Sequence, residues 1–168
     1  MRRLARLACL SSLLLGCTAT AVVAQPDLSG LWEPIPEAST VTLPASNVVP
    51  GAPSPPPPPR TIALNIARQG LVVTMERRLL QGGQESVRSF TYTLDGKATV
   101  NQNGPIELTT TAAWEGDVLV LSSRAAIEGR QFGTVRERYA LVDGQLVVDS
   151  TREWPGGTST SHDVHRRR

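Results

Sequence analysis

The sequence of 168 residues predicts an all-β protein, an antiparallel up-and-down meander that closes, or nearly closes, into a barrel of about eight to nine strands. From Thr61 onward, short runs of Val, Leu, Ile, Thr and aromatic residues alternate with glycine-containing turns about every ten residues. Beyond the amino-terminal segment, no stretch shows the helical period of about 3.6 residues. A β-sandwich is the alternative, but closure better removes the open edges of so many short strands.

Residues 1–24 have the three parts of an export signal. Arg2, Arg3 and Arg6 form a basic start, and an apolar run from Leu7 to Leu15 is too short to span a bilayer. The letters "VVA" before Gln25 are compact residues of the kind found at signal cleavage sites. We therefore expect cleavage after Ala24 and an exported protein, either periplasmic or secreted.

The alternative for this segment is a lipoprotein signal, residues 1–16, followed by an acylated Cys17. The letters "LLGC" at 14–17 resemble a bacterial lipobox, which would make the protein membrane-anchored. Against this, Leu15 stands where a small residue is usual, and the residues after Cys17 are apolar rather than a solvated tether.

Cysteine and charge counts exclude several classes of protein. Cys9 and Cys17 both lie in the signal, so a chain cleaved after Ala24 has no disulfide and no thiolate metal site. The removed segment carries three arginines and no acid, which leaves 14 basic and 15 acidic residues and changes the net charge from +2 to −1. The net charge of the cleaved chain therefore gives no argument for nucleic-acid or anionic-membrane binding.

The middle of the chain is predicted to be a linker, because ten of the 13 prolines lie between residues 33 and 60. The run Pro55–Pro59 cannot donate backbone hydrogen bonds and favours polyproline II, a stiff spacer of ~3.1 Å per residue. A ligand for proline-reading domains is the alternative. The expected parts are the signal 1–24, an amino-terminal Trp segment 25–32, the linker 33–60 and the barrel domain 61–168.

Turn signals separate the predicted strands of the barrel domain. Asp95-Gly96, Asn103-Gly104 and Asp143-Gly144 supply the positive φ angles that tight hairpins need. The strands expected from these signals are 61–68, 71–79, 86–94, 98–102, 106–114, 118–125, 132–142, 145–154 and 158–165.

The alternation of apolar and polar residues predicts a register for the first of these hairpins. If the turn is Gln69-Gly70, Leu64 lies opposite Met75 and Ile66 lies opposite Val73. These four residues then form an inward, apolar face.

A second register follows from the turn at Asp143-Gly144. It places Tyr139 opposite Val148 on the inward face. On the outward face it places Arg138 opposite Asp149, an exposed ion pair worth ~0.5 kcal/mol.

The segment "DLSGLWE" at 27–33 resembles the opening of lipocalin-like proteins, in which a Gly-x-Trp, here Gly30-Leu31-Trp32, precedes or begins the first strand. "TYTLDG" and "AAWEGDVLVL" are similar to segments of small exported bacterial proteins with lipocalin-like barrels. The Thr-Asp-Tyr motif of typical lipocalins is absent. The resemblance implies that Trp32 closes one barrel end under a late-strand arginine. The candidate is Arg152, which shares a face with Val148; a ligand contact for Trp32 is the alternative.

The inward face of the last hairpin also carries charge. Glu137 and Arg152 are diagonal neighbours there, next to Tyr139. A buried charge must be paired, so the simpler interpretation is a structural ion pair. The alternative is a polar anchor for a ligand, in which case the ligand-binding residues are Trp32, Glu137, Tyr139 and Arg152.

No catalytic or metal site is predicted. His162 and His165 are three residues apart, so within a strand their rings point to opposite faces and cannot converge on a metal ion. No Gly-x-Ser-x-Gly motif occurs, and the turn acids Glu115 and Asp117 are expected to be solvated. The tail Arg166–Arg168 is expected to fray at the surface. We expect no enzymatic activity and no cofactor.

The resemblance implies an exported barrel that binds a small apolar or amphipathic ligand without transforming it. The alternative is a structural or interaction module of the cell envelope with a filled barrel and no ligand. An apolar cavity edged by Glu137 or Arg152 would favour the first, and a filled interior the second. No nucleic-acid partner is expected, and the membrane is a partner only through acylated Cys17.

Overall fold

The computed structural model describes residues 25–42 and 60–168, which form one antiparallel sheet of eleven strands. All nine strands expected after residue 60 are present, and two more precede the proline run, so the total exceeds the eight to nine predicted. No helix of the described residues is long and apolar enough to cross a membrane. The elements are β1 Gly30–Pro34, a 3-10 helix η1 Pro36–Ala38, β2 Thr40–Thr42, β3 Arg60–Gln69, β4 Val72–Gln81, β5 Gln84–Thr93, β6 Ala98–Asn103, β7 Ile106–Glu115, β8 Val118–Ile127, β9 Arg130–Val142, β10 Gln145–Trp154 and β11 Gly157–Arg167.

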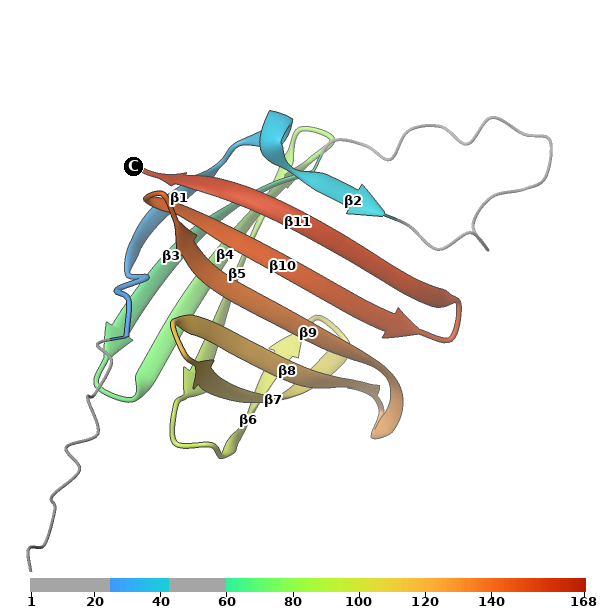
Figure 1. Ribbon diagram of the computed structural model, residues 1–168. Helices are drawn as coiled ribbons and strands as arrows, with labels where there is room; N and C mark the ends of the chain where they lie inside the picture. Colours follow the sequence, from blue (N-terminus) through green and yellow to red (C-terminus); the bar gives the residue numbers. More distant parts are fainter. Residues whose placement is uncertain (1–24, 43–59) are drawn as a thin grey trace, which may run out of the picture.

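The first strand joins the two halves of the sheet (Figure 1). From one edge to the other, the strand order is β5-β4-β3-β1-β11-β10-β9-β8-β7-β6. In β1, Trp32 pairs with Leu64 of β3 on one side and with Arg167 of β11 on the other. All other connections in this order are hairpins between neighbours, so the predicted up-and-down meander is confirmed.

The predicted linker 33–60 begins too early. Its first residues belong to the sheet: β1 extends to Pro34, and β2 pairs with β11, with Thr40 opposite His162. Between them, Ile35 N donates to Val164 O at 2.7 Å, and Ser39 Oγ accepts from Val164 N at 3.1 Å. The polyproline prediction for Pro55–Pro59 falls outside the described residues.

The register predicted for the first hairpin is wrong by two residues. Ile66 lies opposite Met75 and Leu64 opposite Arg77, because the two-residue loop is Gly70-Leu71 rather than Gln69-Gly70. Gly70 has φ +60°, which suits a loop with glycine in its first position. A shift of two residues preserves the face of each side chain, so the expected inward residues, Val73 included, are buried.

The register predicted for the Asp143-Gly144 hairpin is confirmed, with Tyr139 opposite Val148 and Arg138 opposite Asp149. The predicted ion pair between Arg138 and Asp149 is wrong, because each of the two side chains binds a residue on the side away from the other. Arg138 Nη1 binds Glu115 Oε2 at 2.9 Å, and Asp149 Oδ1 lies 2.7 Å from His162 Nδ1. Glu115 is thus held by arginines rather than simply solvated.

The interior differs between the two ends of the barrel. The end near the Gly70-Leu71 turn is packed with apolar side chains, among them Met75 and Phe90, which are 0% and 3% exposed. Toward the opposite end, the inward positions of β5 continue as Arg88 and Ser86, which are exposed. The barrel therefore has a closed apolar end and an open mouth.

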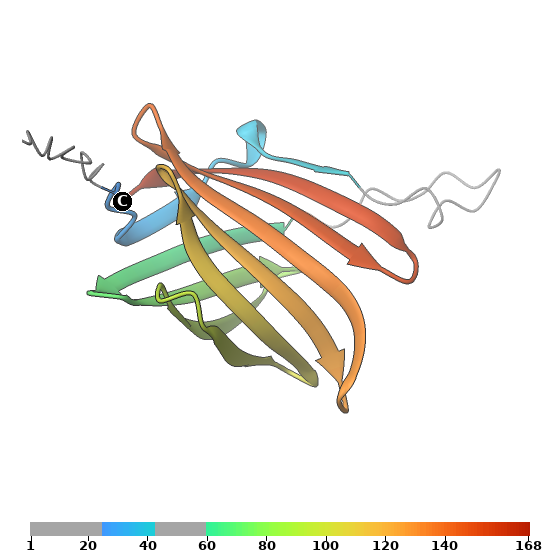
Figure 2. The ribbon, with the colours of Figure 1, turned by 60° about the horizontal axis from the view of Figure 1, so that its bottom comes forward.

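A seam between β5 and β6 leaves the barrel nearly closed, because these edge strands do not pair with each other (Figure 2). The Asn101 side chain of β6 bridges it. Asn101 Oδ1 accepts from Thr91 N at 2.9 Å, and Asn101 Nδ2 donates to Thr91 O at 3.0 Å. The side-chain amide thus takes the place that a neighbouring peptide group occupies in a regular ladder.

The substitution Asn101→Ala should open this seam. It removes two exposed hydrogen bonds, so we expect a loss of about 1 kcal/mol in the free energy of unfolding. Amide hydrogen exchange should accelerate at Thr91 and leave the centre of β9 unchanged. Gln102→Ala, at the next and exposed position of β6, is the matched control. Equal exchange at Thr91 in both variants would contradict the bridging role.

Candidate functional site

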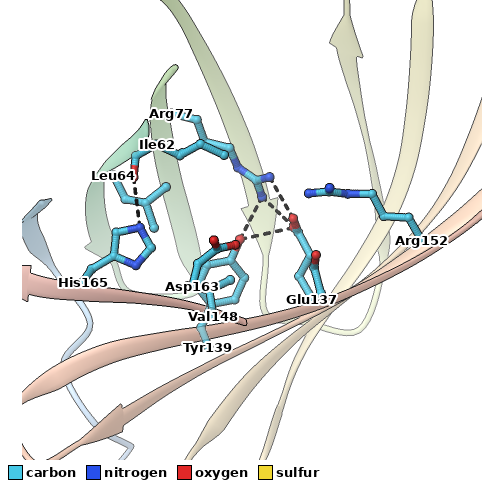
Figure 3. A pocket seen from close by; sticks show the side chains of 10 residues that line it. Ile62, Leu64, Arg77, Glu137, Tyr139, Val148, Arg152, Asp163 and His165 are labelled. Carbon is cyan, nitrogen blue, oxygen red and sulfur yellow. Dashed lines mark hydrogen bonds and ion pairs between the residues drawn. The ribbon is translucent and has the colours of Figure 1, made fainter. Parts of the chain in front are cut away.

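The interior cavity lies between the mouth and the closed end of the barrel. One wall of it is formed by β3 and β4, and the other by β9, β10 and β11 (Figure 3). Its volume of about 30 Å³ is close to that of one or two water molecules. The residues that line it are Ile62, Leu64, Arg77, Glu137, Tyr139, Val148, Ser150, Arg152, Asp163 and His165.

An ion pair crosses the interior at this level. Arg77 of β4 binds Glu137 of β9 with both terminal nitrogens: Nη1 donates to Oε1 at 2.8 Å and Nη2 to Oε2 at 2.6 Å. The Arg77 side chain is 23% exposed and that of Glu137 is 8% exposed. The Arg77 guanidinium also lies over the Phe90 ring, 5.1 Å from its centroid.

Burial would raise the pKa of Glu137, but the Arg77 charge and hydrogen bonds outweigh burial, and the Arg152 charge adds to them. The net effect is a pKa of Glu137 below its ordinary value. The glutamate is therefore a carboxylate at neutral pH, and its favourable interactions are present only above the range in which it titrates.

Tyr139 completes this hydrogen-bonded group. Its hydroxyl accepts from Arg77 Nη2 at 2.8 Å and donates to Glu137 Oε2 at 3.2 Å. Burial raises the pKa of Tyr139 well above its ordinary value, and burial likewise raises the pKa of Tyr92 to about 12. Both phenols are thus neutral hydrogen-bonding groups throughout the physiological range, and neither is a base.

Arg152 of β10 points toward this group from the mouth side (Figure 3). The side chain is half-buried, yet within the described part of the chain its guanidinium has no hydrogen bond and no ion pair within 4.0 Å. The arginine contributes charge, lowering the pKa of Glu137 without contacting it directly. Arg152 is therefore a cation whose donors remain free to bind an anionic group.

Buried polar atoms line the other side of the cavity. His165 Nε2 lies 3.0 Å from Ile62 O, and because a carbonyl only accepts, this nitrogen carries the proton. Burial lowers the pKa of His165, which keeps the ring neutral at pH 7. His165 Nδ1 and Arg77 Nε are buried with no hydrogen-bond partner in the described residues. A polar molecule in the cavity would therefore gain hydrogen bonds that the protein does not make itself.

Two serines extend the polar wall. Ser150 Oγ and Ser161 Oγ are 2.7 Å apart, and Ser161 Oγ donates to Asp163 Oδ2 at 2.9 Å. This chain of hydroxyls occupies donors and acceptors within the wall. Among the described residues, the Arg152 guanidinium at the rim is left without a partner.

The site residues expected from the sequence are only partly brought together. Glu137, Tyr139 and Arg152 line one cavity, but Trp32 does not. The expected pairing of Glu137 with Arg152 is wrong, since the carboxylate binds Arg77 instead. Arg77 was missed, although it has the same parity along β4 as the inward Met75, and this alternation was the available signal.

Trp32 lies at the closed end, 1% exposed, with Nε1 donating to Leu28 O at 2.9 Å. A late-strand arginine does cover its ring, but it is Arg167, at 4.6 Å from the centroid, and not Arg152. The reason is strand order, because β11 rather than β10 is the neighbour of β1. The expected fraying of the tail is therefore wrong for Arg167, which ends β11 and donates from Nη2 to Asp27 O at 3.1 Å.

The two histidines lie on opposite faces of β11. His162 is exposed beside Asp149, and His165 is buried. Among the described residues, no three His, Cys, Asp or Glu side chains lie close enough to hold a metal ion. Cys17, the alternative acylation site, lies outside the described residues.

No family model and no curated protein matches this sequence. Solved structures do match its fold. A secretory abundant heat soluble (SAHS) protein from Ramazzottius varieornatus has a TM-score of 0.54 and 12% identity, covering 84% of this chain and 95% of that one. The REP1-NXSQ fatty acid transporter has a TM-score of 0.52 and 14% identity, covering 84% and 96%. Human cRBP IV has a TM-score of 0.51 and 13% identity, covering 85% and 99%. The chain thus shares with these proteins the fold of a nearly closed antiparallel β-barrel.

The variant Arg77→Met should leave the Glu137 carboxylate buried without its partner. We expect a loss of about 3 kcal/mol in the free energy of unfolding at pH 7. In the native protein the pKa of Glu137 is lowered, so its carboxylate stabilises the fold above the pH range in which a free glutamate titrates. This stabilisation is lost as the pH falls through the lowered pKa. The difference in the free energy of unfolding between the native protein and the variant should therefore shrink toward acid pH. Urea unfolding at several pH values measures this difference.

The double variant Arg77→Met/Glu137→Leu is the control for this experiment. Removing both charges should restore most of the stability lost in the single variant. A double variant as unstable as Arg77→Met would show that the packing of the arginine side chain, and not the charge left on Glu137, causes the loss.

Proposed function

We propose that the protein binds, without transforming it, a small amphipathic ligand whose anionic group contacts Arg152. The observation that carries this proposal is the Arg152 guanidinium, half-buried at the cavity rim and without a hydrogen-bond or ion-pair partner among the described residues. A cation in this position gains most from an anion, because its alternative partner Glu137 is already bound by Arg77.

The packing of the interior restricts where the rest of the ligand lies. The closed end is filled by side chains such as Met75, Phe90 and Leu146, none more than 3% exposed, so an apolar tail cannot enter there. The mouth, by contrast, has exposed inward positions on β5. The ligand therefore has its anionic group at Arg152 and its apolar part toward the mouth, where it leaves the barrel.

The solved structures support binding rather than catalysis. The REP1-NXSQ protein is named a fatty acid transporter, and it shares this fold at 14% identity. In the described part of this chain, the buried phenols of Tyr92 and Tyr139 are neutral, so neither is placed as a general base.

A filled barrel that acts as a structural or interaction module of the envelope is the second candidate. The observation in its favour is the cavity volume of about 30 Å³, well below the roughly 300 Å³ of ordinary ligand pockets. This candidate needs no ligand at Arg152, so the same experiment tests both.

Fluorescence titration with anilinonaphthalene sulfonate, which is both apolar and anionic, tests the proposal. The native protein should bind the dye with a micromolar Kd, and Arg152→Met should weaken binding about tenfold or more, since a hydrogen bond to a charged group is lost. Arg78→Met, which removes an exposed charge from the outer face of β4, is the matched control. Oleate should displace the dye.

Either of two results would overturn the proposal. Absence of dye and oleate binding by a folded protein would leave the filled barrel as the function. Equal loss in Arg152→Met and Arg78→Met would show that the dye responds to overall charge rather than to this site.

We also propose that the protein is exported, periplasmic or secreted, on the basis of the amino-terminal pattern described above. Cleavage after Ala24 predicts a mature chain that begins at Gln25. Intact-mass measurement of the protein purified from its native host checks this. A mass that includes two or three acyl chains on Cys17 would instead establish the lipoprotein, and a full-length cytoplasmic chain would contradict export.

A further inference from the structure

A second hollow lies on the outer face of the sheet. It has a volume of about 530 Å³, lies over β7, β8, β9 and β10, and is within the size range of ligand sites. Its side chains alternate along the strands with inward ones: outward Ser122 and Arg136, for example, are each next to an inward residue, Leu121 and Glu137. The hollow is therefore separated from the interior cavity by the sheet itself.

The polar side chains of this hollow form a regular lattice. In the row nearer the mouth, the strand pairing places Thr109, Arg124, Thr134 and Glu153 side by side. In the next row it places Thr111, Ser122, Arg136 and Thr151 side by side. Neighbouring members of a row are separated by the strand spacing of about 4.8 Å, and the rows by about 6.7 Å along the strands. All eight positions carry a hydroxyl, a guanidinium or a carboxylate.

Two guanidiniums occupy the middle strands of the lattice. Arg136 Nη2 is held by Glu115 Oε1 at 2.7 Å, which orients the arginine and leaves other donors exposed. Arg124 is exposed and has no hydrogen bond or ion pair within the described ranges 25–42 and 60–168. The one acid of the lattice, Glu153, accepts from Thr134 Oγ1 at 3.0 Å at the far edge. The centre of the hollow is therefore positive and its surround is rich in hydroxyls.

We propose that this hollow binds an anionic oligosaccharide, one that carries sulfate or carboxylate groups, lying across the strands. A row presents one polar group for about every 4.8 Å, a repeat comparable with the length of one pyranose residue. The hydroxyls of the lattice can both donate and accept, as sugar hydroxyls require. The planar donor array of each arginine matches the oxygens of a sulfate or carboxylate.

Calorimetric titration with a heparin-derived tetrasaccharide tests this proposal, with maltotetraose as its uncharged counterpart. The native protein should bind the charged sugar with a Kd below 1 mM and maltotetraose at least tenfold more weakly. Arg124→Met should weaken binding of the charged sugar about tenfold, which corresponds to the loss of one charge-assisted contact. Thr151→Val, which keeps side-chain shape and removes one hydroxyl, should weaken it about threefold.

The matched control is Arg78→Met, since Arg78 is an exposed outward arginine on β4, on the opposite wall. It should bind the sugar as the native protein does. Equal weakening in Arg78→Met and Arg124→Met would mean attraction by overall charge and would overturn the site. Equal affinity for both sugars, or binding to neither, would also overturn it.

The position of the bound sugar separates this proposal from the interior one. Amide chemical-shift changes should map to the outward residues of β7–β10, and the sugar should not displace anilinonaphthalene sulfonate from the native protein. Displacement of the dye by the tetrasaccharide would place the sugar at Arg152 and contradict an outer site. Because the two sites lie on opposite faces, failure of one leaves the other unaffected.

Discussion

The Arg77–Glu137 ion pair is the contact on which the arrangement of the interior depends. It joins β4 to β9, strands that are not neighbours in the sheet, through two hydrogen bonds of 2.8 and 2.6 Å. On one side of it the apolar side chains of both walls pack together; on the other, the inward positions of β5 are exposed. Desolvation of the two charges offsets much of their attraction, so the pair adds little net stability. Its effect is instead to fix the distance between the walls and to occupy the carboxylate that Arg152 would otherwise bind.

Closure of the barrel depends on a different feature, the placement of the first strand between the third and the last. A strand of five residues would be marginal alone, but β1 is paired on both sides and anchored by Trp32 beneath Arg167. After β1 the chain continues along the same edge of β11, where Ile35 N donates to Val164 O and β2 pairs with residues 160–162. The open seam falls between β5 and β6, the two ends of the strand order, and the Asn101 side chain spans it.

The sequence was most informative where a pattern repeats every two residues. Alternation and turn residues identified nine strands and assigned Leu64, Ile66, Val73 and Met75 to the interior even with the register wrong by two, because a shift of two keeps each face. Contacts between strands distant in sequence could not be predicted this way. Whether Glu137 binds Arg152 or Arg77, and whether Trp32 lies under Arg152 or Arg167, depends on strand order, which alternation does not encode. The end of β1 and the short strand β2 were not predicted, because the proline-rich composition of residues 33–60 resembles that of a linker.

The two sides of the β9–β10 hairpin differ in how their charges are used. On the inner side Glu137 is bound by Arg77 and Arg152 has no partner among the described residues, so the ligand that we propose there brings negative charge, and the low dielectric of the interior strengthens its contact. On the outer side the arginines face solvent, where a single contact is weak and screened by salt. Recognition on that face must therefore come from several modest contacts at once. The hydroxyls and guanidiniums that the strand register places side by side would supply them to the sugar that we propose, whereas the ligand proposed for the interior relies on Arg152.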